Sequence, residues 1–528
     1  MNTLPHEIVE RIAFISATSS PIGPPTDLVG LLSVNRHIYS RLSFNANQYL
    51  YARIYHAKFD VGTSLHHPAA QPSPSALAHQ LRHRCRVLSR IRARSSDDDD
   101  VHELLFHAYL MMLENVGKNE RQLRDYARMG DWLRAYLFED HLPPPSQRPR
   151  ASSRLEHWPP QNDHVSLAMW LFWFLLRPDD FMLDDDATWN VLDILKIYAL
   201  GAHKYPLTDP CWVNFLPDSP QHSTPIVHYS EQHNLRTPPL ATPAILSFLT
   251  LVNLKTRAFD FAAHMDLPLK PDSDNGAHEW EFELGRCLSL SRPEFGSMLT
   301  ESFRSGSVQG TWEGIFTYTE FTAYAALLQG APPPTLQKSV IVRHKQTWKL
   351  REHHLLVPVD RFGGVDGDEL CKQEPLSAGD PLRAYLPTGT LYEETEEGLS
   401  VRDPVTGKDL WYSKAKGGPQ EDEEKRPRAV VRDIIIKGEG HSAWGQFNLI
   451  GRVRPCDGFI SLCKEYTDHD RGKWIYRGYL VGNVNSNLAG RWRDTLSPAA
   501  VPGYEGCFLM SRRRAGLGVG FGSRGGRR

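Results

Sequence analysis

The chain has 528 residues, too many for one ordinary globular core, and its length predicts about two to four packed domains. Its 60 lysines and arginines nearly balance 62 aspartates and glutamates, which leaves a net charge of −2. This balance provides no global field to attract nucleic acid or an anionic membrane surface, so neither is an expected partner. A hydrophobic content of 41% excludes a wholly disordered chain.

The 7 cysteines are scattered, and no two have the C-x-x-C spacing of a zinc ribbon. Their odd number argues against a disulfide framework and fits a reducing compartment. The N-terminus has neither the basic start nor the apolar run of a signal peptide. The most apolar stretch, residues 165–176, is far shorter than the ~20 residues of a membrane-spanning helix, so we expect a buried core helix there. These features predict an intracellular protein of the cytoplasm or nucleus.

Residues 1–60 are expected to form a compact helical unit. Leu4, Ile8 and Ile12 recur at helical spacing, and Pro5 stands in the first turn, where its missing N–H costs nothing. A loop rich in serine and proline follows, and further apolar helical patterns complete the unit.

Residues 61–100 combine proline and histidine with a basic stretch and then a run of aspartates. Opposite charge blocks beside proline and serine are typical of an exposed, partly mobile segment, so we predict a flexible linker. Residues 101–299 show helical patterns separated by proline-rich spacers. We expect a mainly helical middle region without the fixed-period repeat of a solenoid.

The pattern changes near residue 300, where short alternating runs begin, separated by turn residues. Residues 399–402 and 408–412, for example, flank an Asp-Pro-Val-Thr-Gly turn. Many short strands rich in aromatic residues predict an antiparallel β-barrel, which removes exposed sheet edges by closing on itself. The expected fold is therefore α+β and multidomain, with the barrel over 300–513 and a disordered Gly/Arg-rich tail over 514–528.

The N-terminal pattern resembles an F-box over about residues 3–50. The resemblance depends on Leu4-Pro5-x-Glu7-Ile8, then Ile12, then Asp27-Leu28-x-x-Leu31-Leu32-Ser33-Val34. It implies short helices whose apolar faces dock on the Skp-type adaptor of a Skp–cullin–F-box ubiquitin ligase. By match, the adaptor-binding residues would be Leu4, Pro5, Ile8, Ile12, Leu28, Leu31, Val34 and Tyr39. The alternative is a helical hairpin that simply covers the core behind it.

The C-terminal region resembles the calycin type of barrel, and in particular the barrel-like tail of many fungal F-box proteins. Gly310-Thr311-Trp312 is similar to the Gly-x-Trp signature on the first strand of lipocalins. The resemblance implies that Trp312 plugs one barrel end and packs under an arginine of the last strand, for which Arg512 is the candidate. A barrel of about eight strands is either filled by its own side chains or holds one small ligand. The aromatic residues favour a filled interior.

Several possible metal sites fail on spacing. His102 and His107 are five residues apart and would point to different faces of a helix. His79 and His83 are four apart and would share a face, but only Cys85 is available nearby as a third ligand. We interpret them as surface histidines and predict no metal and no cofactor.

The remaining catalytic pattern is also incomplete. Gly440-His-Ser442-Ala-Trp444 lacks the second glycine that a nucleophile elbow needs for its sharp turn. We therefore expect no catalytic residue. A hydrolase would instead require His441 and Ser442 to converge with Asp433 or Glu439.

The sequence thus favours a non-enzymatic substrate receptor. The F-box would bind the adaptor and through it a cullin–RING ligase, and the barrel would present a surface to a protein target that the sequence does not identify. The alternative is a small-ligand carrier or sensor, in which the barrel holds an apolar molecule beneath a helical cap.

Overall fold

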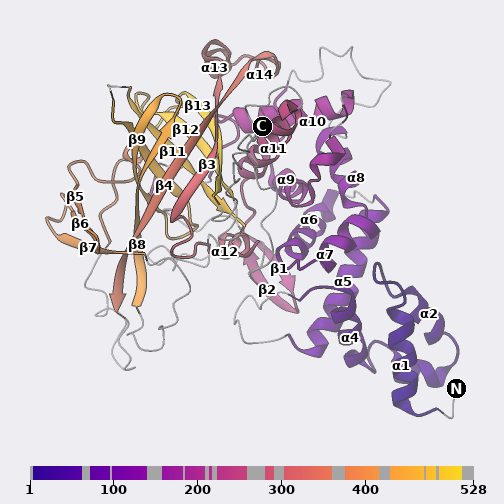
Figure 1. Ribbon diagram of the computed structural model, residues 1–528. Coiled ribbons are helices and arrows are strands. Elements are labelled where there is room, and N and C mark those ends of the chain that lie inside the picture. The colour runs from indigo at the N-terminus through magenta and orange to yellow at the C-terminus, as the bar shows by residue number, and fades with distance from the viewer. Residues whose placement is uncertain are drawn as a thin grey trace, which may run out of the picture.

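The change of sequence pattern near residue 300 corresponds to a change from helices to strands in the computed structural model (Figure 1). The structure describes residues 4–61, 72–94, 98–139, 157–181, 183, 185–208, 213–216, 223–257, 280–289, 302–358, 375–415, 429–468, 471–482 and 487–513. The N-terminal part is a helical region and the C-terminal part an eight-stranded antiparallel barrel, so the predicted α+β multidomain fold is confirmed. The predicted tail, 514–528, lies outside the described residues.

Four short helices open the chain. They are α1 (His6–Ala17), α2 (Thr26–Leu32), α3 (Arg36–Leu42) and α4 (Gln48–Lys58). The side chain of Asn35 caps α3 by accepting a hydrogen bond from the backbone N–H of Ile38 at 2.8 Å, and Asn47 caps α4 in the same way. Pro5 precedes the first helical residue, so it lies at the N-cap of α1 rather than inside the first turn.

The prediction of a flexible linker over 61–100 is wrong for most of its length. Helix α5 (Pro74–Arg92) occupies this segment, and the Ser73 side chain caps it. The helix is amphipathic, since one face carries the buried apolar side chains Leu77, Leu81, Leu88 and Ile91. The many basic residues between them favoured the wrong prediction of an exposed segment. Residues 62–71 and 95–97 lie outside the described part.

The middle region is mainly helical, as predicted. Its helices are α6 (Asp98–Leu113), α7 (Lys118–Arg121), η1 (Gln122–Tyr126), α8 (Met129–Arg134), η2 (Ala135–Glu139), α9 (Asp163–Leu175), η4 (Pro178–Phe181), α10 (Asp186–Leu200), α11 (Ala241–Arg257) and α12 (Glu281–Ser289). A hairpin of β1 (Thr224–His228) and β2 (Glu231–Leu235) lies among them and was not predicted. Its turn residues, Tyr229 and Ser230, both have positive φ, as a type I′ hairpin turn requires.

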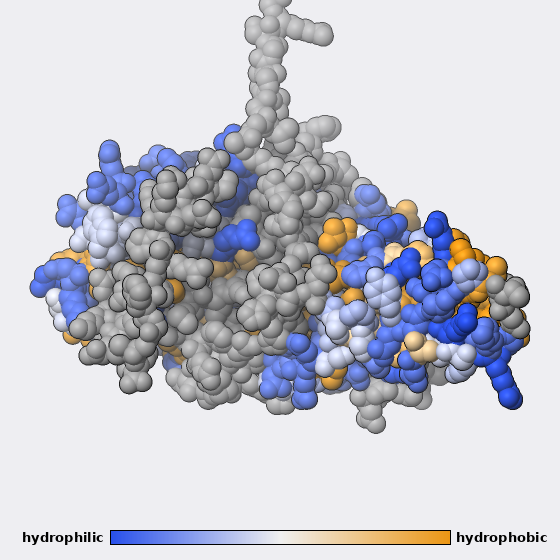
Figure 2. Space-filling model, turned by 90° about the horizontal axis from the view of Figure 1, so that it is seen from below, coloured by the Kyte–Doolittle hydropathy of each residue, from blue (hydrophilic) through white to orange (hydrophobic). Residues whose placement is uncertain are grey.

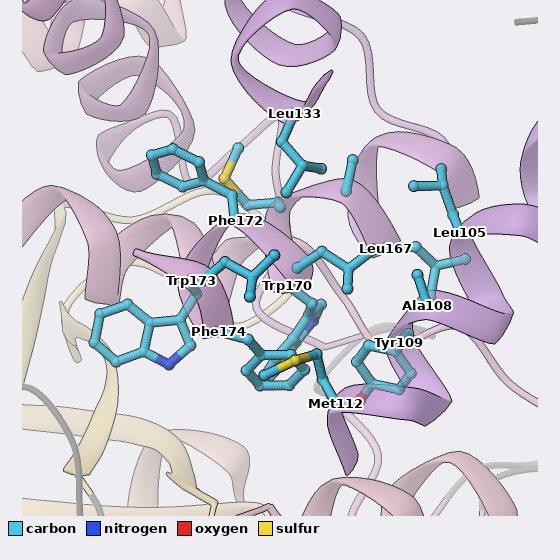
Figure 3. Packing of buried hydrophobic residues seen from close by; sticks show 14 of the residues in the cluster. Leu105, Ala108, Tyr109, Met112, Leu133, Leu167, Trp170, Phe172, Trp173 and Phe174 are labelled. Atoms are coloured by element: carbon cyan, nitrogen blue, oxygen red, sulfur yellow. The ribbon is translucent and has the colours of Figure 1, made fainter. Parts of the chain in front are cut away.

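Helix α9 is the centre of the helical region. Every residue from Val165 to Leu175 is buried, which confirms the prediction of a core helix. Figure 3 shows Trp170 and Phe174 packed beside Tyr109 of α6, with the rings of Phe174 and Tyr109 stacked at 5.6 Å. No helix among the described residues combines the length and apolar character needed to cross a membrane.

The barrel closes through pairing of its first and second long strands. The strands are β3 (Gly310–Thr319), β4 (Ile341–Pro358), β8 (Ala429–Ser442), β9 (Gly445–Val453), β10 (Ile460–Tyr466), β11 (Lys473–Val481), β12 (Asn487–Asp494) and β13 (Glu505–Arg512). Neighbours run β3-β13-β12-β11-β10-β9-β8-β4, and β4 pairs back with β3. The predicted turn at 403–407 joins β6 (Gly398–Arg402) to β7 (Asp409–Lys414).

Several smaller elements lie between the barrel strands in sequence. Helices α13 (Phe321–Leu328) and α14 (Pro334–Lys338) lie between β3 and β4 in sequence, and η7 (Pro381–Arg383) precedes β5 (Leu391–Glu394). Strands β5, β6 and β7 form an extension that joins the barrel where β7 pairs with His353 and His354 of β4. The extension leaves β5 at the end of the strand order.

The barrel and the helical region share one hydrophobic core. Ile315, Tyr479 and Leu509 point out of the barrel and belong to the same buried cluster as the side chains of α9, α10 and α11. Buried Arg491 of β12 donates hydrogen bonds to the backbone carbonyls of Tyr198 and Ala199, at the C-terminal end of α10, and to that of Tyr205 in the segment that follows. This guanidinium satisfies carbonyl groups that the end of a helix leaves without partners.

Candidate docking surface

Helix α1 has two apolar faces, and only one of them meets the core. Val9, Ala13 and Ala17 are buried against the neighbouring helices. On the other face Ile8 is 45% exposed and Ile12 is 37% exposed. Two predicted adaptor-binding residues therefore lie at the surface of a helix whose core contacts are already made by other side chains.

Helices α2 and α3 and the turn between them extend this surface. Val34 is 56% exposed and Tyr39 is 58% exposed, while Leu31 is half-buried. At the start of α1, Pro5 is exposed and Leu4 is half-buried against the core. Most of the residues predicted from the F-box resemblance therefore have apolar surface open to solvent.

Leu28 is the exception among the predicted contact residues. It is 2% exposed and belongs to the hydrophobic core, so its assignment to a contact surface is wrong. The same inward face of these helices carries Ile38 and Leu42. A seven-residue helix such as α2 completes only about two turns, so one of its leucines must fix it to the protein.

The exposed apolar side chains form what we call the docking face. Sequence matching did not identify Ile15 of α1 or Val29 of α2, although both are more than half exposed. Figure 2 shows orange apolar surface among blue polar surface at the end of the molecule where these helices lie. The docking face consists of Ile8, Ile12, Ile15, Val29, Val34 and Tyr39.

The long loop between α1 and α2 is attached to the helical region, which fixes the docking face in place. The Lys58 ammonium donates a hydrogen bond to the Ser20 carbonyl at 2.6 Å. The Gln122 side chain accepts one from the Gly23 N–H at 2.7 Å and donates one to the Pro21 carbonyl at 3.1 Å. Gly23 has φ +77°, and an added Cβ would lie 2.6 Å from the Tyr126 ring. Only glycine therefore fits at this position, where the loop backbone packs closely against Tyr126.

The proposed barrel signature residues come together at one end of the barrel. Trp312 is fully buried, and its indole N–H donates a hydrogen bond to the Val308 carbonyl at 2.7 Å. The Arg512 guanidinium lies 5.1 Å from the Trp312 ring centroid, a cation–π arrangement, and it donates a hydrogen bond to the Ser307 carbonyl. Gly310 begins the strand with φ +129°, a conformation that favours glycine.

The second Gly-x-Trp sequence, at 490–492, has a different role. Gly490 faces Gly478 on the neighbouring strand, and a Cβ on Gly490 would lie 1.8 Å from the Arg477 carbonyl oxygen. Glycine is needed here because the strands approach too closely for a side chain.

The interior of the barrel contains one unusual residue, Lys464 of β10. It is 1% exposed, and its ammonium nitrogen lies 3.9 Å from the Phe447 ring centroid and 4.8 Å from that of Tyr466. Phe316 and Tyr476 complete the cage of rings. Among the described residues no carboxylate pairs with this amine. Burial alone lowers the pKa of Lys464 to about 7.

A groove of about 350 Å³ lies on the outside of the barrel over β4, β8 and β9. Its wall includes Lys349, Glu439, His441 and Asn448, whose side chains alternate with the inward-pointing residues of the same strands. The Glu439 carboxylate lies 3.8 Å from the Lys349 ammonium and 2.6 Å from the Arg351 guanidinium. Charged side chains therefore line part of the groove, although most of its exposed surface is apolar.

The residues that a hydrolase would need do not converge. His441 is exposed and Ser442 is buried, because neighbours on a strand point to opposite faces. The Asp433 carboxylate is held elsewhere, 2.7 Å from the Arg452 guanidinium and 2.7 Å from the Tyr412 hydroxyl.

Of the two histidines predicted to lie at the surface, His79 does so and His83 is only partly exposed. His79 is exposed, with its ring against that of Phe44. His83 instead lies beside His107 of the next helix, with 3.9 Å between ring centroids. The prediction that His102 and His107 point to different faces of one helix is correct. Spacing within one helix cannot predict the contact of His107 with His83, because these residues lie on two helices.

No family model, no curated protein and no solved structure matches this chain.

Proposed function

We propose that this chain is the substrate-recognition subunit of a Skp–cullin–F-box ubiquitin ligase. The observation that carries the proposal is the docking face, where apolar side chains of α1, α2 and α3 remain in solvent although a core lies directly behind them. Exposed apolar surface of this kind marks a protein–protein contact. Such a receptor would work in the cytoplasm or nucleus, where the ligase is found.

The barrel would present the target-binding surface. Its outer groove offers charged and polar side chains, which suit recognition of another protein's surface. Ubiquitin transfer would be performed by the other subunits, so the chain contributes proximity rather than a reacting group.

The alternative, a small-ligand carrier, needs an internal cavity. Buried side chains of the barrel cluster pack inside the described strands, among them Trp312, Phe316, Trp348, Tyr476 and Phe508. This packing favours the receptor. Native mass spectrometry of the full chain tests the alternative, because a stoichiometric bound ligand would support the carrier.

The adaptor contact is tested by co-purifying the full chain with a Skp-type adaptor. Val34→Asp and Ile8→Asp should abolish binding, because each places a carboxylate without a partner in an apolar interface. These positions are better than Leu31, whose half-buried side chain also packs on the core. A single apolar anchor contributes about 2 kcal/mol, so Ile8→Ala should weaken the complex about 30-fold.

Val405→Asp is the matched control. Val405 is 69% exposed in the turn between β6 and β7, so this variant adds the same charge far from the docking face. It should bind the adaptor as the wild type does. Normal binding by Val34→Asp and Ile8→Asp, with folding verified by circular dichroism, would contradict the proposal.

A further inference from the structure

Helices α5 and α6 bring together two imidazoles and a carboxylate. His83 comes from α5, and Glu103 and His107 come from successive turns of α6. The His107 Nε2 atom lies 3.8 Å from a Glu103 carboxylate oxygen, and one potential ligand atom from each of the three residues lies within 4.8 Å of the others. His107 is 2% exposed, whereas the Glu103 side chain is 59% exposed.

One ring nitrogen in this cluster has no partner among the described residues. His83 Nε2 is buried, and it has no hydrogen-bond partner within the part of the chain that the structure describes. The two imidazoles are in ring contact without a hydrogen bond between them. Buried polar atoms are nearly always satisfied by a partner, a water or an ion, so this arrangement calls for a group that is shared between the rings.

The neighbouring charges leave room for a cation. The Arg84 guanidinium is paired with the Glu114 carboxylate, and the second oxygen of Glu114 lies 2.6 Å from His228 Nε2. Arg86 is exposed, so solvent screens its charge. The Glu103 carboxylate adds a negative charge directly at the cluster.

We propose that His83, Glu103 and His107 form a zinc-binding site that joins α5 to α6. Two imidazoles and one carboxylate are a ligand set that proteins use for Zn²⁺ when one coordination position stays open. Exposure of the Glu103 side allows water to complete the tetrahedron. The site is independent of the proposed adaptor contact, because none of its ligands belongs to the docking face.

Calorimetric titration of the chelator-treated full chain with ZnCl₂ tests the site. We expect saturable binding of one zinc ion, a rise in melting temperature on zinc addition, and the visible absorption of a tetrahedral site when Co²⁺ replaces Zn²⁺. Absence of stoichiometric binding would overturn the proposal.

Two variants and a control assign the ligands. Glu103→Gln changes an exposed side chain, so the fold is retained, and His83→Gln removes the orphaned nitrogen. Each should weaken zinc binding by more than the 10–100-fold typical of losing an indirect, supporting contact. His79→Gln lies one turn away on the same helix and should bind zinc like the wild type. Equal affinity in all of these proteins would place any bound zinc elsewhere and overturn the assignment.

Discussion

Lys464 lies where the other inward positions of its strand carry apolar or aromatic side chains. Ile460, Leu462 and Tyr466 share its face of β10, because alternate residues of a strand point to the same side. The pattern could not show that four rings from four strands would surround the amine, because that cage exists only after the barrel closes.

Replacing Lys464 should stabilise the protein in a pH-dependent way. Between the folded-state pKa of about 7 and the ordinary value of 10.5, the unfolded chain binds a proton that the folded chain does not, so stability rises with pH over this window. Lys464→Met removes the free-energy cost of burying an amine that loses its proton on folding. At pH 7 the variant should be more stable than the wild type by about 4 kcal/mol, a difference that shrinks toward pH 10.

Urea unfolding of both proteins from pH 7 to 10 measures this difference. Titration of other groups cancels in the comparison, and Lys408→Met, at an exposed turn residue, controls for the loss of one positive charge. A stability difference that stays constant with pH would contradict the account of the buried amine.

At the scale of elements, the strands were easier to predict than one of the helices. Turn residues and alternation located the hairpin of β6 and β7 almost to the residue, because both signals are local. Helix α5 was missed because its arginines and flanking prolines were given more weight than its buried leucines. The β1–β2 hairpin was missed because its short strands are polar and follow a proline-rich spacer.

The candidate site was predictable to a similar degree. The apolar spacing of the N-terminal sequence located the helices that carry the docking face, but the exposed Ile15 and Val29 and the buried Leu28 depend on how these helices rotate against α4 and the rest of the core. That rotation is a tertiary property. The zinc-site ligands were missed for the same reason, since they lie on two helices.

Helix α3 depends on its cap. The Asn35 side chain accepts the N–H of Ile38, and removing such a cap costs about 1 kcal/mol. Asn35→Ala should therefore speed hydrogen exchange of the α3 amides about fivefold, as measured by mass spectrometry, while Asn35→Asp retains an acceptor and should exchange like the wild type. Unchanged exchange in Asn35→Ala would show that the cap does not stabilise the helix.

At the scale of the whole molecule, Arg491 connects barrel and helices through buried hydrogen bonds to the end of α10. Arg491→Met leaves those carbonyls without donors in a buried position. We expect a loss of about 3 kcal/mol in unfolding free energy, measured by guanidinium titration. Arg491→Lys keeps the charge but not the planar fork, so it should recover only part of the loss. Full stability in Arg491→Met would refute this role.

The sequence predicted a helical middle region and a barrel as distinct domains, because each has its own pattern, and it left their packing open. It could not reveal that the outward residues of β3, β11 and β13 complete a core with α10 and α11. Outward-pointing apolar residues such as Tyr479 and Leu509 were the available signal. A free-standing barrel would show polar residues at those positions.

This common core determines how the two ends of the molecule move. The loop after α1 is hydrogen-bonded to the helical region, and the helical region shares a hydrophobic core with the barrel. We therefore expect the N-terminal helices and the outer groove to keep a fixed distance and orientation. The connection between the two ends is thus expected to be rigid rather than flexible. A partner bound in the groove would then be held at one distance and one orientation from a partner bound at the docking face.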